Sequence, residues 1–194
     1  MKKVLLLFGL GAWLVMGCLV IATTVLLTCA GPNAPGQVGP GQTPGGGAAG
    51  SAVSIPATVP IDIKGQTFHL EMALTPDQQF QGLSDRPEIA EDGGMIFVFA
   101  SAKKRAFVMR RCLVPIDIAF VSPTGSVTAV HAMQVVPYDT PEFRLKPYRS
   151  RYPAQYAIEV AGGTWERIGL EAGDQLDLPA EKLKAWREKA DAEQ

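Results

Sequence analysis

Charged side chains are almost missing from the first third of this 194-residue chain, which has none between Lys3 and Asp62. The charges that follow nearly cancel, and the formal net charge of the chain is −1. This balance gives no general argument for nucleic-acid binding. The chain is therefore divided into an uncharged N-terminal part and a C-terminal part that holds almost all of its charge.

Cysteine is also scarce, and Cys112 is the only one of three that lies beyond residue 30. An internal disulfide is therefore excluded in the C-terminal part. A lone thiol is either buried and inert or exposed and reactive, and we expect it to be buried here. Phosphate-loop, zinc-protease and dinucleotide-binding motifs are absent, and no ligand pair has a diagnostic metal spacing. The sequence predicts neither a metal nor another cofactor.

A long apolar run follows Lys2 and Lys3 and covers residues 4–30. It exceeds the ~20 residues that a helix needs to cross ~30 Å of hydrocarbon, and the two lysines orient its N-terminus toward the cytoplasm. We expect a single-pass anchor in the cell membrane, with the C-terminal domain on the periplasmic or extracellular side. Lipidation at Cys29 and simple cleavage near Ala30 are the alternatives, and both also export the domain.

The remaining chain divides by composition into three parts. Residues 31–58 are rich in Gly, Pro, Ala, Gln and Ser and cannot bury enough apolar surface to fold, so we expect a flexible linker. Residues 59–179 are expected to form the globular domain. Residues 180–194 are expected to form a charged helix that docks through Leu183 and Trp186.

The globular part is expected to be mainly β, because short apolar runs alternate with turn signals. Large side chains recur at every second position of residues 116–121, which places Ile116, Ile118 and Phe120 on one face of a strand. Further strands are predicted at 61–63, 68–72, 95–99, 106–109, 127–130, 156–160 and 175–178. Short strands with one or two small helices indicate a compact antiparallel barrel or sandwich.

Two short helices are predicted within this domain. Thr75, Pro76 and Asp77 form a helix start, with a capping hydroxyl, proline at the first helical position and an acid in the first turn. We expect this helix to run to about Leu83 and to place Phe80 and Leu83 on its inner face. The second helix is a single turn at residues 164–168.

Several of these segments resemble a known family in order and spacing. The matching segments are residues 94–99, 107–109 and 115–120, with Gln81-Gly82-Leu83, Arg86, residues 156–162 and 172–174 beside them. Together they resemble the bacterial and archaeal family called domain of unknown function 192, over residues 61–178. The resemblance implies a compact, mainly β, exported or membrane-attached domain, with acids at the positions of Asp117 and Glu159.

The chain departs from that family at two motifs. Residues 81–86 read Gln-Gly-Leu-Ser-Asp-Arg where the family usually has Arg-Gly-Leu-Met-x-Arg. Residues 108–112 read Val-Met-Arg-Arg-Cys where the family usually has Trp-Met-Lys-Asn-Thr. Any family site that uses the Asn and Thr side chains would therefore be altered here.

The candidate ligand-binding residues are polar or soft side chains near these motifs, namely Met109, Arg110, Arg111, Asp117, Glu159 and Arg86. In one interpretation Asp117 and Glu159 lie on a solvent-exposed face of the sheet. In the other they share a concave surface with the arginines, as ligand contacts or as an acid and a base. Two basic segments, 103–111 and 144–151, would form an anion-binding or sugar-binding rim if they lie together.

The function expected from the sequence is a membrane-tethered extracytoplasmic module that binds an anionic small molecule or an envelope glycan. One alternative is a hydrolase or transferase that uses Asp117 and Glu159, and another is a protein-interaction component of an envelope complex. The sequence contains no evident nucleophile or positioned histidine, so it does not establish an enzyme. The expected location outside the cytoplasm argues against a nucleic-acid partner.

Overall fold

The computed structural model describes residues 54–194. The expected membrane anchor and most of the expected linker fall outside the described residues. Between residues 54 and 194, no helix has both the length and the apolar character needed to span a membrane.

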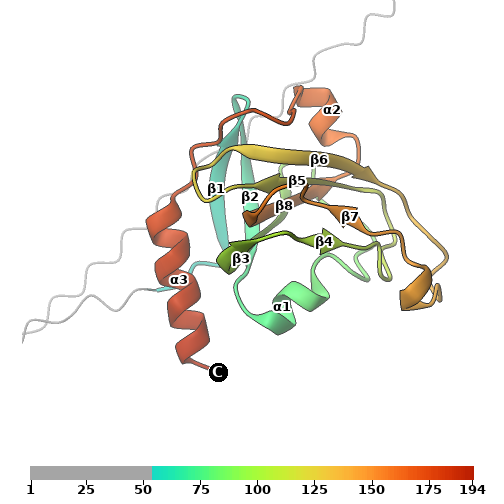
Figure 1. Cartoon of the computed structure of the whole chain (residues 1–194), viewed down its shortest axis with the longest axis horizontal. Helices are drawn as coiled ribbons and strands as arrows, with labels where there is room; N and C mark the ends of the chain where they lie inside the picture. The colour runs from blue at the N-terminus through green and yellow to red at the C-terminus, as the bar shows by residue number, and fades with distance from the viewer. Residues whose placement is uncertain (1–53) are drawn as a thin grey trace, which may run out of the picture. The chain divides into compact units, whose positions relative to one another are not determined.

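Six strands form the main sheet, in the order β1-β2-β3-β8-β5-β6 (Figure 1). Their bounds are β1 Thr58–Ile63, β2 Gln66–Ala73, β3 Gly93–Lys103, β5 Ile116–Val121, β6 Val127–Met133 and β8 Ala154–Ala161. The prediction of a mainly β domain is confirmed. The expected antiparallel order is wrong for one pair, because β2 and β3 run parallel. Helix α1 (Pro76–Gln81) and the loop after it return the chain to the end where β2 began.

A second, two-stranded ladder covers one face of the main sheet. It pairs β4 (Ala106–Phe107) with β7 (Tyr148–Arg149), and both Phe107 and Tyr148 pack against the core beneath. The main sheet ends at β1 on one edge and at β6 on the other. The domain is therefore a mixed sheet covered by a ribbon rather than a closed antiparallel barrel.

Apolar cores lie on both faces of the main sheet, and β5 contributes to both. Ile116, Ile118 and Phe120 enter the core beneath the β4–β7 ribbon, as their alternation predicts. Ala119 and Val121 enter the opposite core. Strands with two buried faces lack an outward polar face. The interpretation that placed Asp117 and Glu159 in solvent is therefore wrong, and their exposed fractions are 3% and 5%.

Helices α2 (Thr164–Ile168) and α3 (Ala180–Ala192) supply side chains to that opposite core. Trp165 of α2 packs edge-on against Phe68, with ring centroids 5.8 Å apart. Leu183 of α3 is fully buried and Trp186 packs beside the same core. The predicted position and docking residues of α3 are confirmed.

Helix α1 begins as predicted, since the Thr75 hydroxyl accepts a hydrogen bond from the Gln78 amide and Pro76 occupies the first turn. The helix ends at Gln81, and Gly82 then takes a φ of 50°. Leu83 is buried as expected, but the Phe80 side chain is 68% exposed. The i, i+3 relation between Phe80 and Leu83 fails because the helix stops between them.

Two strand predictions and one loop prediction differ from the structure. The expected strand at 106–109 ends at Phe107, and residues 137–153 contain β7 and the 3-10 helix η1 (Glu142–Arg144) instead of only loop. The expected strand at 175–178 is reduced to a single bridge between Ser126 and Gln175. Short ladders of this kind depend on distant partners, which local sequence patterns do not reveal.

Candidate functional site

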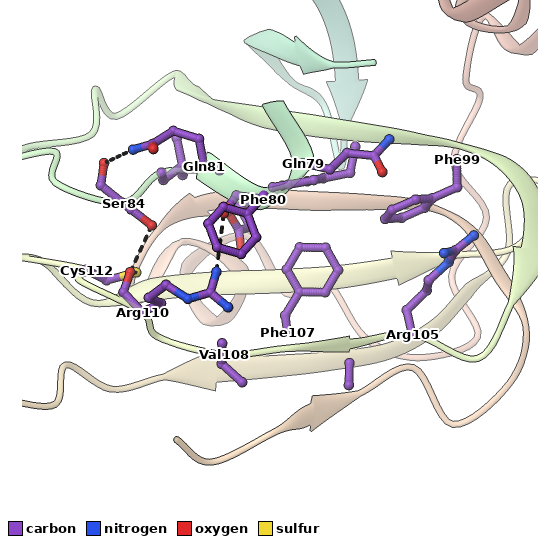
Figure 2. A pocket seen from close by; sticks show the side chains of 15 residues that line it. Gln79, Phe80, Gln81, Ser84, Phe99, Arg105, Phe107, Val108, Arg110 and Cys112 are labelled. Carbon is purple, nitrogen blue, oxygen red and sulfur yellow. Dashed lines mark hydrogen bonds between the residues drawn. The ribbon is translucent and has the colours of Figure 1, made fainter. Parts of the chain in front are cut away.

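A pocket with a cavity volume of ≈ 260 Å³ lies between the end of α1, strand β3 and the start of β4 (Figure 2). Its apolar walls come chiefly from phenylalanines. The Phe97 and Phe107 rings meet edge-on with centroids 4.8 Å apart, and Phe99 lies 6.4 Å from Phe107. Such a cavity, smaller than the ~300–1,000 Å³ of most ligand sites, suits a small molecule with an apolar body.

Glu159 of β8 lines this pocket and is 5% exposed. Its carboxyl group has no hydrogen-bond or ion-pair partner within residues 54–194. Burial raises the pKa of Glu159 from 4.5 to about 8, because the ionised form would lose its hydration. The group is therefore mostly a neutral carboxylic acid at pH 7, and its hydrogen-bonding capacity is unused.

Arg105 provides a positive charge that no carboxylate in the described part of the chain neutralises. Its guanidinium lies 3.8 Å from the centroid of the Phe99 ring and donates one hydrogen bond to the Ser101 carbonyl at 2.7 Å. The Arg105 Nε is buried and has no acceptor within residues 54–194. Burial also lowers the pKa of Arg105, which reflects the cost of desolvating an uncompensated cation. An anionic ligand would offset that cost.

Arg110 lines the same pocket but already has a partner. Its Nε and Nη2 donate to the two oxygens of the Glu142 carboxylate, which raises the pKa of Arg110, and its guanidinium lies 4.2 Å from the Phe80 ring centroid. In Figure 2 the Phe107 ring lies between Arg105 and Arg110. With Arg110 neutralised by Glu142 and Glu159 protonated, the pocket keeps the net positive charge of Arg105.

Cys112 borders the pocket, and the prediction that it is buried is confirmed by an exposed fraction of 7%. Burial raises its pKa to about 11, and the nearby Glu159 carboxyl adds to the shift. The thiol donates to the Arg110 carbonyl at 3.4 Å. Nucleophilic catalysis requires a thiolate, so the structure does not support Cys112 as a nucleophile at neutral pH.

Asp117 and Glu159 point to opposite faces of the sheet. Residues in register share a face, and Asp117 pairs with Val160 whereas Glu159 pairs with Ile118. Val160 belongs to the core that contains Trp165, and Ile118 belongs to the core beneath the ribbon. The hydrolase or transferase alternative that uses these two carboxylates together is therefore wrong, because no single substrate can touch both.

Asp117 instead holds the start of α2. Its Oδ2 accepts a hydrogen bond of 2.9 Å from the Trp165 backbone N–H, and this bond is buried. The arrangement satisfies one of the amides that a helix leaves free at its N-terminus. Asp117 thus has a structural contact and lies outside the pocket lining.

We expect Asp117→Ala to lower the free energy of unfolding by about 1–3 kcal/mol, because it leaves a buried amide without an acceptor. Urea denaturation of the domain would measure the loss. Asp117→Asn is the matched control and should lose less, since its amide oxygen can still accept from Trp165. A role for Asp117 in the pocket would instead appear as weaker ligand binding with unchanged stability.

The other predicted site residues lie outside the pocket lining. Met109 is a core residue with 2% exposure. The Arg111 side chain is engaged by Asp85, at 2.7 Å, and by Tyr138. Arg86 forms a two-pronged ion pair with Glu71, which lowers the pKa of that carboxyl. The structure therefore brings together only Arg110 and Glu159 of the six candidates.

The two basic segments meet along the β4–β7 ribbon. The Arg105 N–H donates to Ser150 Oγ at 2.9 Å, and the Ser150 N–H donates to the Arg105 carbonyl at 3.0 Å. These bonds place Lys104 beside Arg149 and Arg151 around one surface hollow. Part of each predicted basic segment therefore does lie on a common rim.

Sequence reasoning included Arg105 only as part of the 103–111 basic segment, without singling it out, and missed the phenylalanine walls. Arg105 was grouped with its basic neighbours, although it sits directly before the β4 strand that covers the pocket. Phe97, Phe99 and Phe107 do carry a signal, because Phe97 and Phe99 alternate on β3 and Phe107 follows in the covering strand. That spacing predicts one shared face but does not show that a cavity remains beside it.

Residues 58–178 match the sequence profile of DUF192, a family described as "Uncharacterized ACR". The chain belongs to the DUF192 family. The resemblance seen in the sequence motifs is thus confirmed over nearly the same range. No curated protein sequence matches the chain.

Two solved structures are similar to this DUF192 domain. One is a Sinorhizobium meliloti 1021 protein named as a candidate transcription regulator, with 28% identity and a TM-score of 0.52, covering 64% of this chain and 97% of its own. The other is a Novosphingobium aromaticivorans protein of unknown function, with 27% identity and a TM-score of 0.54, covering 68% of this chain and 100% of its own. Chains consisting of little more than this domain therefore fold independently.

Proposed function

We propose that this DUF192 domain is a binding module for a small organic anion, held in the pocket beside Arg105. The observation that carries the proposal is a guanidinium without a carboxylate partner in the described chain, stacked on an aromatic wall of an open cavity. A ligand carboxylate, phosphate or sulfate would pair with Arg105, and its apolar body would contact the phenylalanine rings.

The size of the cavity favours a small molecule over a polymeric glycan. A volume of ≈ 260 Å³ holds one ring-sized molecule, such as a substituted aromatic acid or a single acidic sugar. The apolar N-terminal run supports a membrane-tethered, extracytoplasmic setting for this module. In that setting the domain would capture a soluble anion near the membrane or present it to another component.

The protein-interaction alternative has one observation in its favour. The side chains of Phe80 and Phe143 are 68% and 83% exposed. The Arg110 guanidinium lies over the Phe80 ring, and the Arg144 guanidinium lies over the Phe143 ring. Exposed aromatic and arginine side chains are frequent at the centres of protein interfaces. This alternative would gain support if no small anion binds the pocket.

Titration of the 54–194 fragment with benzoate, phenyl phosphate or hexanoate, followed by NMR, tests the proposal. Amide shifts should concentrate around Phe99, Phe107 and Arg105. We expect Arg105→Gln to weaken binding about tenfold or more, because a hydrogen bond to a charged group contributes about 1.5–3 kcal/mol. Exposed Lys182 serves as the control, and Lys182→Gln should not change the affinity. Shifts scattered over the surface, or equal affinity in Arg105→Gln, would contradict the proposal.

A further inference from the structure

The uncharged polar side chains that line the pocket, other than Glu159, already donate to backbone carbonyls. Ser84 Oγ donates to the Arg110 carbonyl at 2.8 Å, and Gln79 Nε2 donates to the Val98 carbonyl at 3.1 Å. Gln81 Nε2 donates to the Ser84 carbonyl at 3.3 Å. Among the described residues that line the cavity, Glu159 is thus the buried uncharged group left with an unused donor.

The polar groups of the pocket lie at different depths. The Arg110 side chain is 27% exposed and Arg105 is half-buried, whereas Glu159 is 5% exposed. Arg105 stacks on Phe99, whereas Glu159 Oε2 lies near the Phe97 ring at the Gly82 side of the same cavity. A ligand that places its charge against Arg105 can therefore extend its opposite end toward the buried carboxyl. The phenyl rings of Phe97 and Phe107 lie along the apolar wall of the cavity.

Gly82 keeps the Glu159 carboxyl reachable from the end of α1. A Cβ at position 82 would lie 3.6 Å from Glu159 Oε2 and 3.3 Å from the Phe97 ring. A side chain there would therefore occupy the space directly beside the carboxyl. The glycine leaves that space for a ligand atom.

We infer that the pocket selects small organic anions carrying a hydrogen-bond acceptor, such as a carbonyl, on the end away from their charge, and that Glu159 recognises this acceptor by donating its carboxyl O–H. The inference rests on the proposed function and specifies its ligand class. A buried donor left without an acceptor is unfavourable, so the pocket should bind ligands with an apolar end about tenfold more weakly.

Two alternatives are physically weaker. An ionised Glu159 would repel the anion that Arg105 attracts, and it would have to be buried without a counter-ion. A cationic ligand would face the uncompensated charge of Arg105 across a small cavity. The raised pKa of Glu159 agrees with the neutral, donating form below about pH 8.

The test compares 4-acetylbenzoate with 4-isopropylbenzoate, which have nearly the same shape but differ in the acceptor. At pH 6 we expect the acetyl probe to bind the 54–194 fragment about tenfold more tightly. The preference should decline above pH 8 as the Glu159 carboxyl ionises. Calorimetric or NMR titrations at pH 6, 7 and 9 would measure both effects.

Two variants separate recognition from folding. Glu159→Gln keeps a donating amide and should prefer the acetyl probe at every pH. Glu159→Met has a similar size but no donor, and its two affinities should agree within about twofold. Equal binding of both probes to the unsubstituted fragment at pH 6 would overturn the inference and leave the proposed function standing. Failure of both probes to bind would overturn the proposed function as well.

Discussion

The Glu159→Gln variant is expected to unfold about 10 °C above the unsubstituted domain at pH 7, a gain of roughly 2–3 kcal/mol. The folded state keeps the Glu159 proton up to about pH 8, whereas the unfolded chain loses it near 4.5. Because the unfolded state binds fewer protons in that window, its ionisation draws the equilibrium toward unfolding as the pH rises. Glutamine fills the same space and does not ionise.

The pH dependence of this gain is the sharper measurement. Thermal unfolding between pH 5 and 8 should show a falling Tm for the unsubstituted 54–194 fragment and a flatter profile for Glu159→Gln. Glu88→Gln removes a carboxylate from the exposed surface and serves as the control. A Tm advantage of Glu159→Gln that is the same at pH 5 and pH 8 would show that ionisation is not the cause.

A binding pocket that presents a shielded hydrogen-bond donor to its ligand must bury a polar group, and burying an acid lowers the stability of the domain. Proteins commonly trade stability for such groups at functional sites. The stability gain of Glu159→Gln and the ligand preference assigned to Glu159 are therefore two measurements of one feature. The first needs no ligand.

Gly94→Ala is expected to lower the free energy of unfolding by more than about 4 kcal/mol, enough to prevent folding of the domain. A Cβ at Gly94 would lie 2.2 Å from the Glu159 carbonyl oxygen and 3.0 Å from Val160 Cγ1. The Glu159 carbonyl is part of the backbone and cannot move aside as a flexible side chain can, so β3 and β8 would have to separate. Gly94 also has a φ of 146°, which alanine rarely adopts.

Gly65→Ala is the matched control, because Gly65 also has a positive φ, of 80°, but faces open space. It should cost only about 1–2 kcal/mol, the strain of a positive φ without a collision. Urea denaturation of both variants gives the comparison. If the two variants lose similar amounts of stability, close packing of β3 on β8 is not what requires glycine at position 94.

The elements specified by local signals were predictable from the sequence. The strands at 61–63, 68–72 and 116–121 and the capped start of α1 all appear as expected, because alternation and capping act over a few residues. Helix α3 was equally clear from Leu183 and Trp186. These features depend on neighbours in the chain, so a single sequence contains them.

The features that depend on distant pairing were not predictable. The parallel pairing of β2 and β3 depends on the path of residues 82–92 rather than on either strand's composition. The depth of Asp117 and Glu159 depends on having a core on each face. The sequence pattern of an acid between apolar residues is the same whether the second face of the sheet is exposed to water or covered by a ribbon.

The candidate site was predictable only in part. Arg110 and Glu159, two of the residues chosen from motifs that stand out from the apolar runs, line one cavity. Asp117 was chosen by the same reasoning and lies on the opposite face. Whether Asp117 and Glu159 face the same side of the sheet depends on the register of β5 against β8. That register pairs residues about 40 positions apart in the chain, so no local sequence pattern reveals it.

Strand β8, the last of the main sheet to be synthesised, lies between β3 and β5. Until residues 154–161 are available, the nascent chain holds β1-β2-β3 and β5-β6 as separate pieces, each with an open hydrogen-bonding edge. Such edges readily pair with other chains. The domain is thus committed to late, all-or-none assembly, and a polypeptide that stops before Ala154 should aggregate rather than persist as a smaller folded form.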